Sequence, residues 1–178
     1  MVLAGCGGNG GNPVQVKRMN LRSVADDNPM LAGRFRAVTA GYSIRPPAGW
    51  VRRKMPGKKT ADGFAVFTSP KTRETLSIFV VKNGPIPTVA MLGSVRDGYI
   101  AGAKKHAGIT LIGTDIFSFK GRYYVQSLVR QGDWITLTLS VYSQSGGMVF
   151  MDYYVKVDNY RLLARAIEAS IASLETAD

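Results

Sequence analysis

Apolar and polar side chains alternate along much of the chain, which is the pattern of β-strands with one buried face. The clearest example runs from Trp134 to Tyr142, where every second side chain is aliphatic. Similar runs, separated by turn residues, predict further strands over residues 34–38, 42–45, 63–68, 75–81, 109–119, 123–130 and 148–157. The runs 63–68 and 75–81 carry large apolar residues at odd and even positions, which is typical of strands covered on both faces.

Two segments have helical periodicity instead. Residues 88–106 begin with Thr88 as a suitable N-cap, and one stripe contains Leu92, Val95, Tyr99 and Ala103. A second helix is predicted after Asp158 or Asn159, with a buried face made of Leu163, Ile167, Ser170, Ile171 and Leu174. The pattern therefore predicts an α+β fold, with a central antiparallel sheet of about six or seven strands and both helices packed on it.

The decapeptide 41–50 reads Gly-Tyr-Ser-Ile-Arg-Pro-Pro-Ala-Gly-Trp. Tyr42 is expected to enter the core, the two prolines to end the strand, and Trp50 to close one end of the sheet. This combination resembles the opening motif of the PsbP family, which pairs a Gly-Tyr or Gly-Phe strand with a Pro-x-Gly-Trp turn. The resemblance extends over residues 38–175 and implies the α/β/α sandwich of that family, in the same wider fold as a eukaryotic Ran-binding import factor.

The resemblance also has implications for location. The best-known PsbP proteins are extrinsic subunits at the lumenal side of photosystem II, and the cyanobacterial kind is a lipoprotein. The present chain departs from the photosynthetic members in its isoelectric point of about 10.0. It also shows no cluster of carboxylates for Ca²⁺. The resemblance therefore implies an extrinsic bacterial lipoprotein without implying a photosystem role.

The single cysteine lies in Leu3-Ala4-Gly5-Cys6, which resembles the lipobox of bacterial lipoproteins, in which the cysteine is acylated. A Gly- and Asn-rich run follows directly and suits a tether. A complete secretory signal has a basic start and an apolar core of about 7–15 residues, whereas five residues precede Cys6. We interpret residues 1–5 as the remnant of a signal peptide, residues 6–33 as a flexible basic tether and residues 34–178 as the PsbP-like domain.

The formal net charge is +11, and it is concentrated near the start of the chain. Residues 17–60 contain eleven lysines and arginines against two aspartates. Such a segment favours an anionic surface or an acidic protein, and it can also be a solvated loop. The densest part provides the candidate residues for binding an anion or a partner: Arg52, Arg53, Lys54, Lys58 and Lys59.

Few residues have the arrangement that catalysis or metal binding requires. One cysteine and one histidine cannot form a zinc site, and no Gly-x-Ser-x-Gly motif is present. His106 follows two lysines at the end of a predicted helix, where it suits the helix dipole. Asp152 and Lys156 are four apart on a predicted strand and are expected to form a pair at the sheet rim. We therefore predict no enzymatic activity, no cofactor and no metal site.

These observations predict a monomeric, non-enzymatic lipoprotein of the bacterial cell envelope. Its lipid on Cys6 would place it on the outer side of the cytoplasmic membrane or on the outer membrane. There it would bind or help assemble a membrane or envelope protein, and a nucleic-acid partner ranks lower. The alternative is a small-molecule carrier or sensor that uses a pocket between sheet and helix. No apolar run approaches the ~20 residues that span a bilayer.

Overall fold

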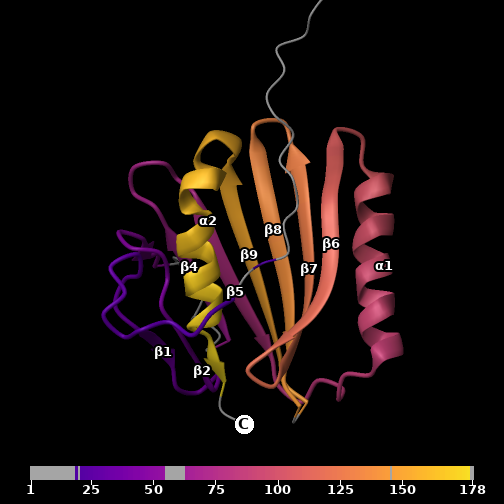
Figure 1. Ribbon diagram of the computed structural model, residues 1–178, viewed down its shortest axis with the longest axis horizontal. Helices are drawn as coiled ribbons and strands as arrows, with labels where there is room; N and C mark the ends of the chain where they lie inside the picture. The colour runs from indigo at the N-terminus through magenta and orange to yellow at the C-terminus, as the bar shows by residue number, and fades with distance from the viewer. Residues whose placement is uncertain (1–18, 20, 55–62, 145, 177–178) are drawn as a thin grey trace, which may run out of the picture.

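An antiparallel sheet of seven strands forms the centre of the described part of the chain (Figure 1). The computed structural model describes residues 19, 21–54, 63–144 and 146–176. Across the sheet the strands follow the order β3 (Val51–Arg52), β4 (Phe64–Thr68), β5 (Thr75–Val81), β9 (Met148–Lys156), β8 (Trp134–Tyr142), β7 (Arg122–Gln131) and β6 (Ile109–Phe119). With two helices packed on this sheet, the predicted α+β class and the strand number are confirmed.

The alternation of side chains decides which face of each strand is buried. In β8, Ile135, Leu137 and Leu139 are at most 1% exposed and point to the inner face of the sheet. The neighbouring strands are paired in a continuous antiparallel register, with Leu137 opposite Tyr153 on β9. The β6–β7 hairpin turns at Lys120 and Gly121, which both have positive φ, as a tight two-residue hairpin turn requires.

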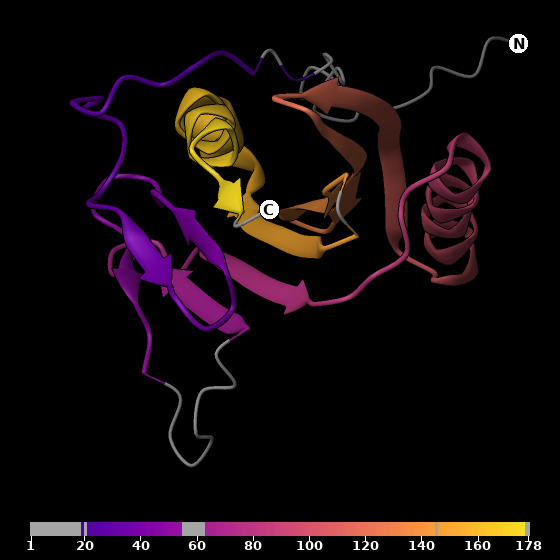
Figure 2. The same ribbon diagram turned by 90° about the horizontal axis from the view of Figure 1, so that it is seen from below.

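The two helices cover different parts of the sheet (Figure 2). Helix α2 (Val157–Ala172) lies inside the curve of the sheet and buries Ile167 and Ile171 in the main core. Helix α1 (Val89–Lys105), capped by Thr88 as predicted, lies outside the curve beside β6 and β7. Among the described residues, no helix covers the outer sides of β4, β5 and β9. Neither helix is long and apolar enough to cross a bilayer.

A second, smaller sheet contains β1 (Phe35–Ala37), β2 (Tyr42–Ile44) and β10 (Glu175–Thr176), in the order β1-β2-β10. The strands predicted over 34–38 and 42–45 therefore pair with each other and with the chain end, apart from the main sheet. Gly49 has φ +78, and Trp50 packs 6.5 Å from Tyr153, measured between ring centroids. The motif 41–50 thus leads from the small sheet into the main core.

Residues 21–33, which we name the N-terminal strap, run along the domain. Met19, just before the strap, is 9% exposed and belongs to the main core. Within the strap, Leu31 forms an isolated β-bridge with Pro47. The sequence assigns these residues to a flexible tether that covers 6–33. The described part of that segment is packed on the domain, and residues 6–18 lie outside the described residues.

Arg45 holds the strap from the domain side. Its guanidinium group donates to three strap carbonyl oxygens, those of Ala25 (3.1 Å), Asn28 (3.4 Å) and Ala32 (3.1 Å). Arginine suits this position because it carries five N–H donors in a fixed fork and keeps its charge. The residue is only 9% exposed, so these bonds replace the water that the guanidinium group would otherwise bind. The strap is therefore part of the folded domain.

Helix α2 begins at Val157, and its N-cap, Lys156, makes no side-chain capping bond. Glu74, which is 1% exposed and comes from the β4–β5 turn, lies at this helix end instead. Its carboxylate accepts from the Lys156 N–H (3.3 Å), the Asn159 amide (2.9 Å) and the Thr72 hydroxyl (2.7 Å). The prediction of Asp158 or Asn159 as the cap is therefore wrong, because a carboxylate distant in sequence complements the helix dipole.

We expect Glu74→Gln to lower the free energy of unfolding by about 1–3 kcal/mol. The buried side chain at position 74 would lose its negative charge and one of the two oxygens that accept hydrogen bonds. Urea unfolding followed by circular dichroism measures this change. The matched control is Asp158→Asn, which removes an exposed carboxylate from the same helix end. Equal, small effects of both substitutions would show that Glu74 does not stabilise α2.

We expect Arg45→Met to detach the strap while the main sheet stays folded. Losing the three hydrogen bonds to strap carbonyl oxygens weakens the attachment of the strap by about 2 kcal/mol. Hydrogen exchange of the strap amides then becomes roughly 30-fold faster. The amide to follow is that of Ala32, which donates to the Pro46 carbonyl oxygen at 2.8 Å. Arg36→Met, at an exposed arginine of β1, is the control. Unchanged exchange at Ala32 would contradict the assignment.

Candidate functional site

The basic segment predicted from the sequence forms one edge of the main sheet. Arg52 belongs to β3, and the Arg53 N–H donates to the Val66 carbonyl oxygen at 2.8 Å. Arg52, Arg53 and Lys54 are all exposed, and we name these three residues the cationic edge. The other two candidates, Lys58 and Lys59, lie outside the described residues, as does Cys6.

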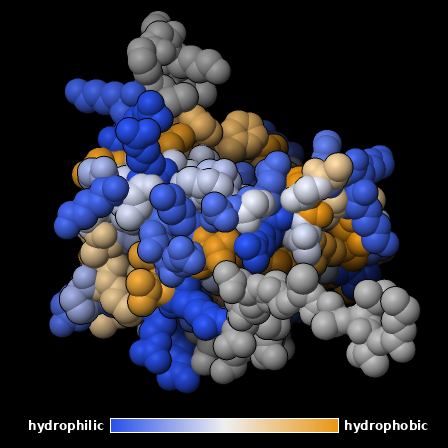
Figure 3. All heavy atoms as spheres, turned by 90° about the horizontal axis from the view of Figure 1, so that it is seen from above, coloured by the Kyte–Doolittle hydropathy of each residue, from blue (hydrophilic) through white to orange (hydrophobic). Residues whose placement is uncertain are grey.

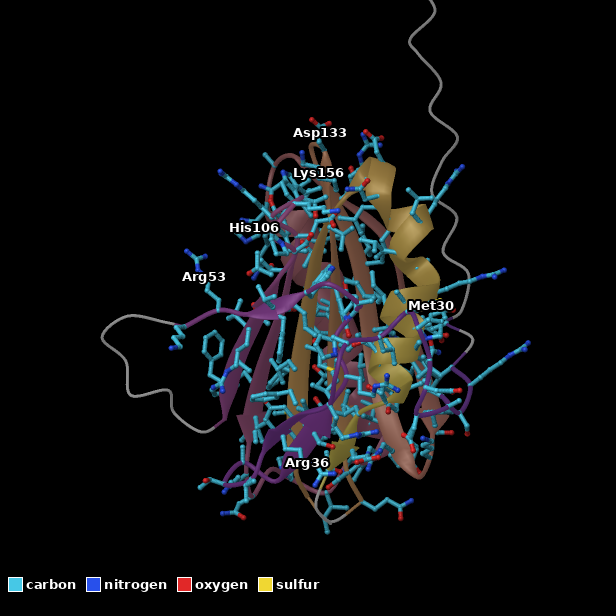
Figure 4. The ribbon with its side chains drawn as sticks, turned by 90° about the vertical axis from the view of Figure 1, so that its left-hand side faces the viewer. Met30, Arg36, Arg53, His106, Asp133 and Lys156 are labelled. Carbon is cyan, nitrogen blue, oxygen red and sulfur yellow. The ribbon has the colours of Figure 1, made fainter. Side chains whose placement is uncertain are left out.

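The arginines of the cationic edge have different surroundings. The Arg52 guanidinium carbon lies 4.7 Å from the centroid of the Phe35 ring, a cation–π contact that orients it toward the small sheet. Burial raises the pKa of the neighbouring Tyr42 to about 12, and the positive charge of Arg52 opposes this shift. Arg53 projects away from the sheet into solvent (Figure 4). Within the described residues, no ion pair joins Arg53 or Lys54 to a carboxylate.

The uncovered outer side of the sheet carries two pairs of aromatic rings. Trp134 and Tyr154 are stacked with centroids 4.2 Å apart and planes 5° apart. Phe79 and Phe150 are stacked with centroids 6.4 Å apart. We name these four side chains the outer aromatic face. The sequence predicts that β5 is covered on both faces, but this is wrong at Phe79, which is 49% exposed because α1 lies over other strands.

A row of polar groups lies between the two aromatic pairs. The Asp152 carboxylate accepts a hydrogen bond from the Thr138 hydroxyl at 2.7 Å. Beside Phe150, with which Ser140 is paired in the sheet, the hydroxyls of Tyr99 on α1 and Ser140 on β8 are 2.6 Å apart. Burial raises the pKa of Tyr99, and the negative charge of Asp152 contributes to this shift. A carboxylate and several hydroxyl groups thus lie close together where α1 meets the open part of the sheet.

The pair predicted between Asp152 and Lys156 is not present among the ion pairs of the described residues. The Lys156 ammonium group lies 5.8 Å from the centroid of the Trp134 ring instead, and Asp152 bonds to Thr138. Both residues do lie on the outer face, as the spacing of four along a strand predicts. The end of the molecule where α2 begins is mostly polar, with smaller apolar patches (Figure 3).

One pattern in the sequence does indicate the outer aromatic face. Trp134 and Tyr154 occupy positions whose in-strand neighbours at a spacing of two are threonine and aspartate. An aromatic residue at such a polar position indicates a surface aromatic side chain, since the opposite face already supplies the core. Register decides the rest, because Phe79 and Phe150 are neighbours only through the pairing of β5 with β9.

The described residues contain no group of three or more His, Cys, Asp or Glu side chains that could hold a metal ion. His106 is exposed and directly follows α1. A hollow of about 400 Å³ lies between α2 and the β4–β5 turn, lined by Trp50, Pro70 and Leu163 among others. The buried Glu74 carboxylate in its wall already accepts a hydrogen bond from the Asn159 amide. The lining of this hollow comes from α2 and from the turns at 48–50 and 69–74, and none of its lining residues belongs to a strand of the main sheet.

The fold is similar to that of cyanobacterial PsbP (CyanoP) from Synechocystis sp. PCC 6803. The TM-score is 0.60 at 19% sequence identity, over 98% of this chain and 98% of that chain. It is also similar to the Ran-binding protein Mog1p of Saccharomyces cerevisiae, with a TM-score of 0.50 at 8% identity over 82% and 95% of the two chains. Neither a protein-family model nor a curated protein matches the sequence.

At these identities the likeness concerns the fold, and it agrees with the motif 41–50 and the order of strands and helices. The resemblance predicted from the sequence is thereby confirmed at the level of architecture. This chain has the PsbP-like fold, which it shares with the Ran-binding protein Mog1p.

Proposed function

We propose that this chain is a non-enzymatic lipoprotein of the bacterial cell envelope. In this proposal a lipid on Cys6 anchors it to the membrane, and the cationic edge binds a membrane or envelope protein. The observation that carries the proposal is the lipobox-like Leu3-Ala4-Gly5-Cys6 a short distance before a packed PsbP-like domain.

The packing of Met19 supports an anchor that keeps the domain near the membrane. Twelve residues lie between Cys6 and Met19, the first described residue. A Gly-rich tether of that length, as the sequence predicts, has an r.m.s. span of ~20 Å. The domain would then remain within about its own diameter of the lipid surface. An acyl anchor combined with basic residues holds more firmly than one acyl chain alone.

The exposure of the cationic edge supports a protein partner with an acidic surface. Positively charged side chains without carboxylate partners steer and orient an oppositely charged protein. Arg52 is already held against Phe35, so part of this surface is pre-organised. Mog1p is named as a Ran-binding protein, so a protein of this fold has a protein partner elsewhere. The property expected of the membrane or envelope partner is therefore an acidic binding surface.

A carrier of small molecules is the second candidate, because a hollow does lie between α2 and the β4–β5 turn. The Glu74 carboxylate in its wall already accepts hydrogen bonds from Asn159 and Thr72, and Leu162 at its rim is 81% exposed. A ligand pocket usually encloses most of its ligand and presents free polar groups that fix orientation. The membrane-anchored binding protein therefore ranks first.

We expect Cys6→Ala to move the protein from the membrane fraction to the aqueous fraction of its own cells. The thiol is the atom that carries the lipid, and without it the basic residues provide only salt-sensitive attraction. Immunoblotting of both fractions, with and without a high-salt wash, measures the change. Cys6→Ala protein that stays membrane-bound after the wash would contradict the lipid anchor.

We expect a photo-crosslinking residue in place of Lys54 to form an adduct with one membrane or envelope protein. Combining it with Arg53→Gln should reduce the adduct about fivefold, because the one lost charge removes on the order of 1 kcal/mol near an acidic surface. The control places the crosslinker at Lys105, an exposed lysine at the far side of the sheet on α1. The same adduct in equal yield from both positions would exclude the cationic edge as the binding surface.

A further inference from the structure

The outer aromatic face is rigid and accessible. In each pair, one ring is well exposed, Tyr154 at 37% and Phe79 at 49%, and a half-buried ring supports it from one side. Trp134 supports Tyr154, and Phe150 supports Phe79. Rings that are already stacked lose little conformational entropy when a ligand binds, so this surface is pre-organised for contact.

The strand register sets the spacing of the face. Tyr154, Asp152 and Phe150 are alternate residues of β9, so the two aromatic pairs lie about 13 Å apart along the strands. Asp152 lies midway, with Ser77 opposite it on β5 and Thr138 opposite it on β8. The face therefore presents aromatic surface, then a row of hydroxyl and carboxylate groups, then aromatic surface again.

The chemistry of this arrangement excludes several classes of ligand. An acyl chain would remove water from the Asp152 carboxylate, whose hydrogen bond from Thr138 satisfies only part of its acceptor capacity. A basic peptide would meet the ammonium group of Lys156 beside Trp134. A bare anion would meet the Asp152 carboxylate at the centre. A pyranose ring fits, because its C–H faces stack on aromatic rings and its hydroxyl edges donate to a carboxylate and exchange hydrogen bonds with hydroxyls.

We propose that the outer aromatic face binds an acidic oligosaccharide. Sugar rings stack on Tyr154 and Phe79, and hydroxyls of the unit between them donate to Asp152. An acidic group on the sugar that stacks on Tyr154 meets Lys156, which extends over the supporting Trp134 ring. A short run of linked pyranose rings spans the distance between the two aromatic pairs. This site goes beyond the proposed function, because it uses neither the lipid nor the cationic edge.

Charge complementarity favours an acidic glycan over a neutral one. The chain carries a net charge of +11, and Lys156 is exposed at the Trp134 end of the face. An anionic group placed there gains a charge-assisted hydrogen bond and lies well away from Asp152, which is four residues from Lys156 along β9. The same placement predicts that the affinity falls with added salt.

Tryptophan fluorescence of the purified full-length chain tests the proposal, because Trp134 is partly exposed and Trp50, the other tryptophan, is 6% exposed. The probes are a tetramer of galacturonic acid and, as the neutral comparison, a tetramer of β-linked glucose. We expect saturable binding of the acidic tetramer, about tenfold tighter than the neutral one at low salt. Lys156→Gln should remove that difference.

Tyr154→Ala should weaken binding of the acidic tetramer at least about tenfold. The matched control is Tyr123→Ala, because Tyr123 is 38% exposed but lies on β7, beyond the two aromatic pairs. Circular dichroism checks that both variants are folded. The proposal is overturned if the acidic tetramer gives no saturable change, if Tyr123→Ala weakens binding as much, or if a crosslinker at position 154 captures a protein instead. A missing lipid on Cys6 would leave these results unchanged.

Discussion

The attachment of the N-terminal strap to Arg45 is the constraint that joins the strap to the small sheet and to the end of α2. A buried guanidinium group needs hydrogen-bond acceptors, and here they are the three strap carbonyl oxygens. Arg45 is itself fixed because its N–H donates to the Ser173 hydroxyl at 2.9 Å, just after α2. The strap, the motif 41–50 and the end of α2 thus form one unit.

The two faces of the main sheet are covered to different extents. The inner face is filled by α2 and by core side chains such as Leu137 and Met151, which water does not reach. The outer face is covered by α1 beside β6 and β7, and α1 reaches β8 through the contact of Tyr99 with Ser140 (Figure 2). Within the described residues, the cationic edge is exposed, and so are Tyr154 and Phe79 of the remaining outer surface. Surface side chains of this kind can differ between proteins of one fold while the inner core remains the same.

The sequence predicts the parts of the fold that have a strong period. The alternation in 134–142, the stripe and cap of α1, and the motif 41–50 all correspond to observed features. The attachment of the strap was not predicted because Arg45 holds it through backbone carbonyl oxygens, which produce no pattern of side chains in the sequence. The cap of α2 and the pairing of Phe79 with Phe150 depend on contacts between residues distant in sequence. Within the candidate site, the charge of the cationic edge can be predicted from the sequence. The outer aromatic face depends on the strand register, which the sequence pattern does not specify.

The most direct test of the envelope assignment is mass spectrometry of the N-terminal peptide from protein purified out of its own cells. A lipid-anchored protein gives a peptide that begins at Cys6 and carries the added mass of a diacylglyceryl group on its sulfur. An unmodified Cys6 that is still joined to Gly5, in protein recovered from the aqueous fraction, would contradict the account.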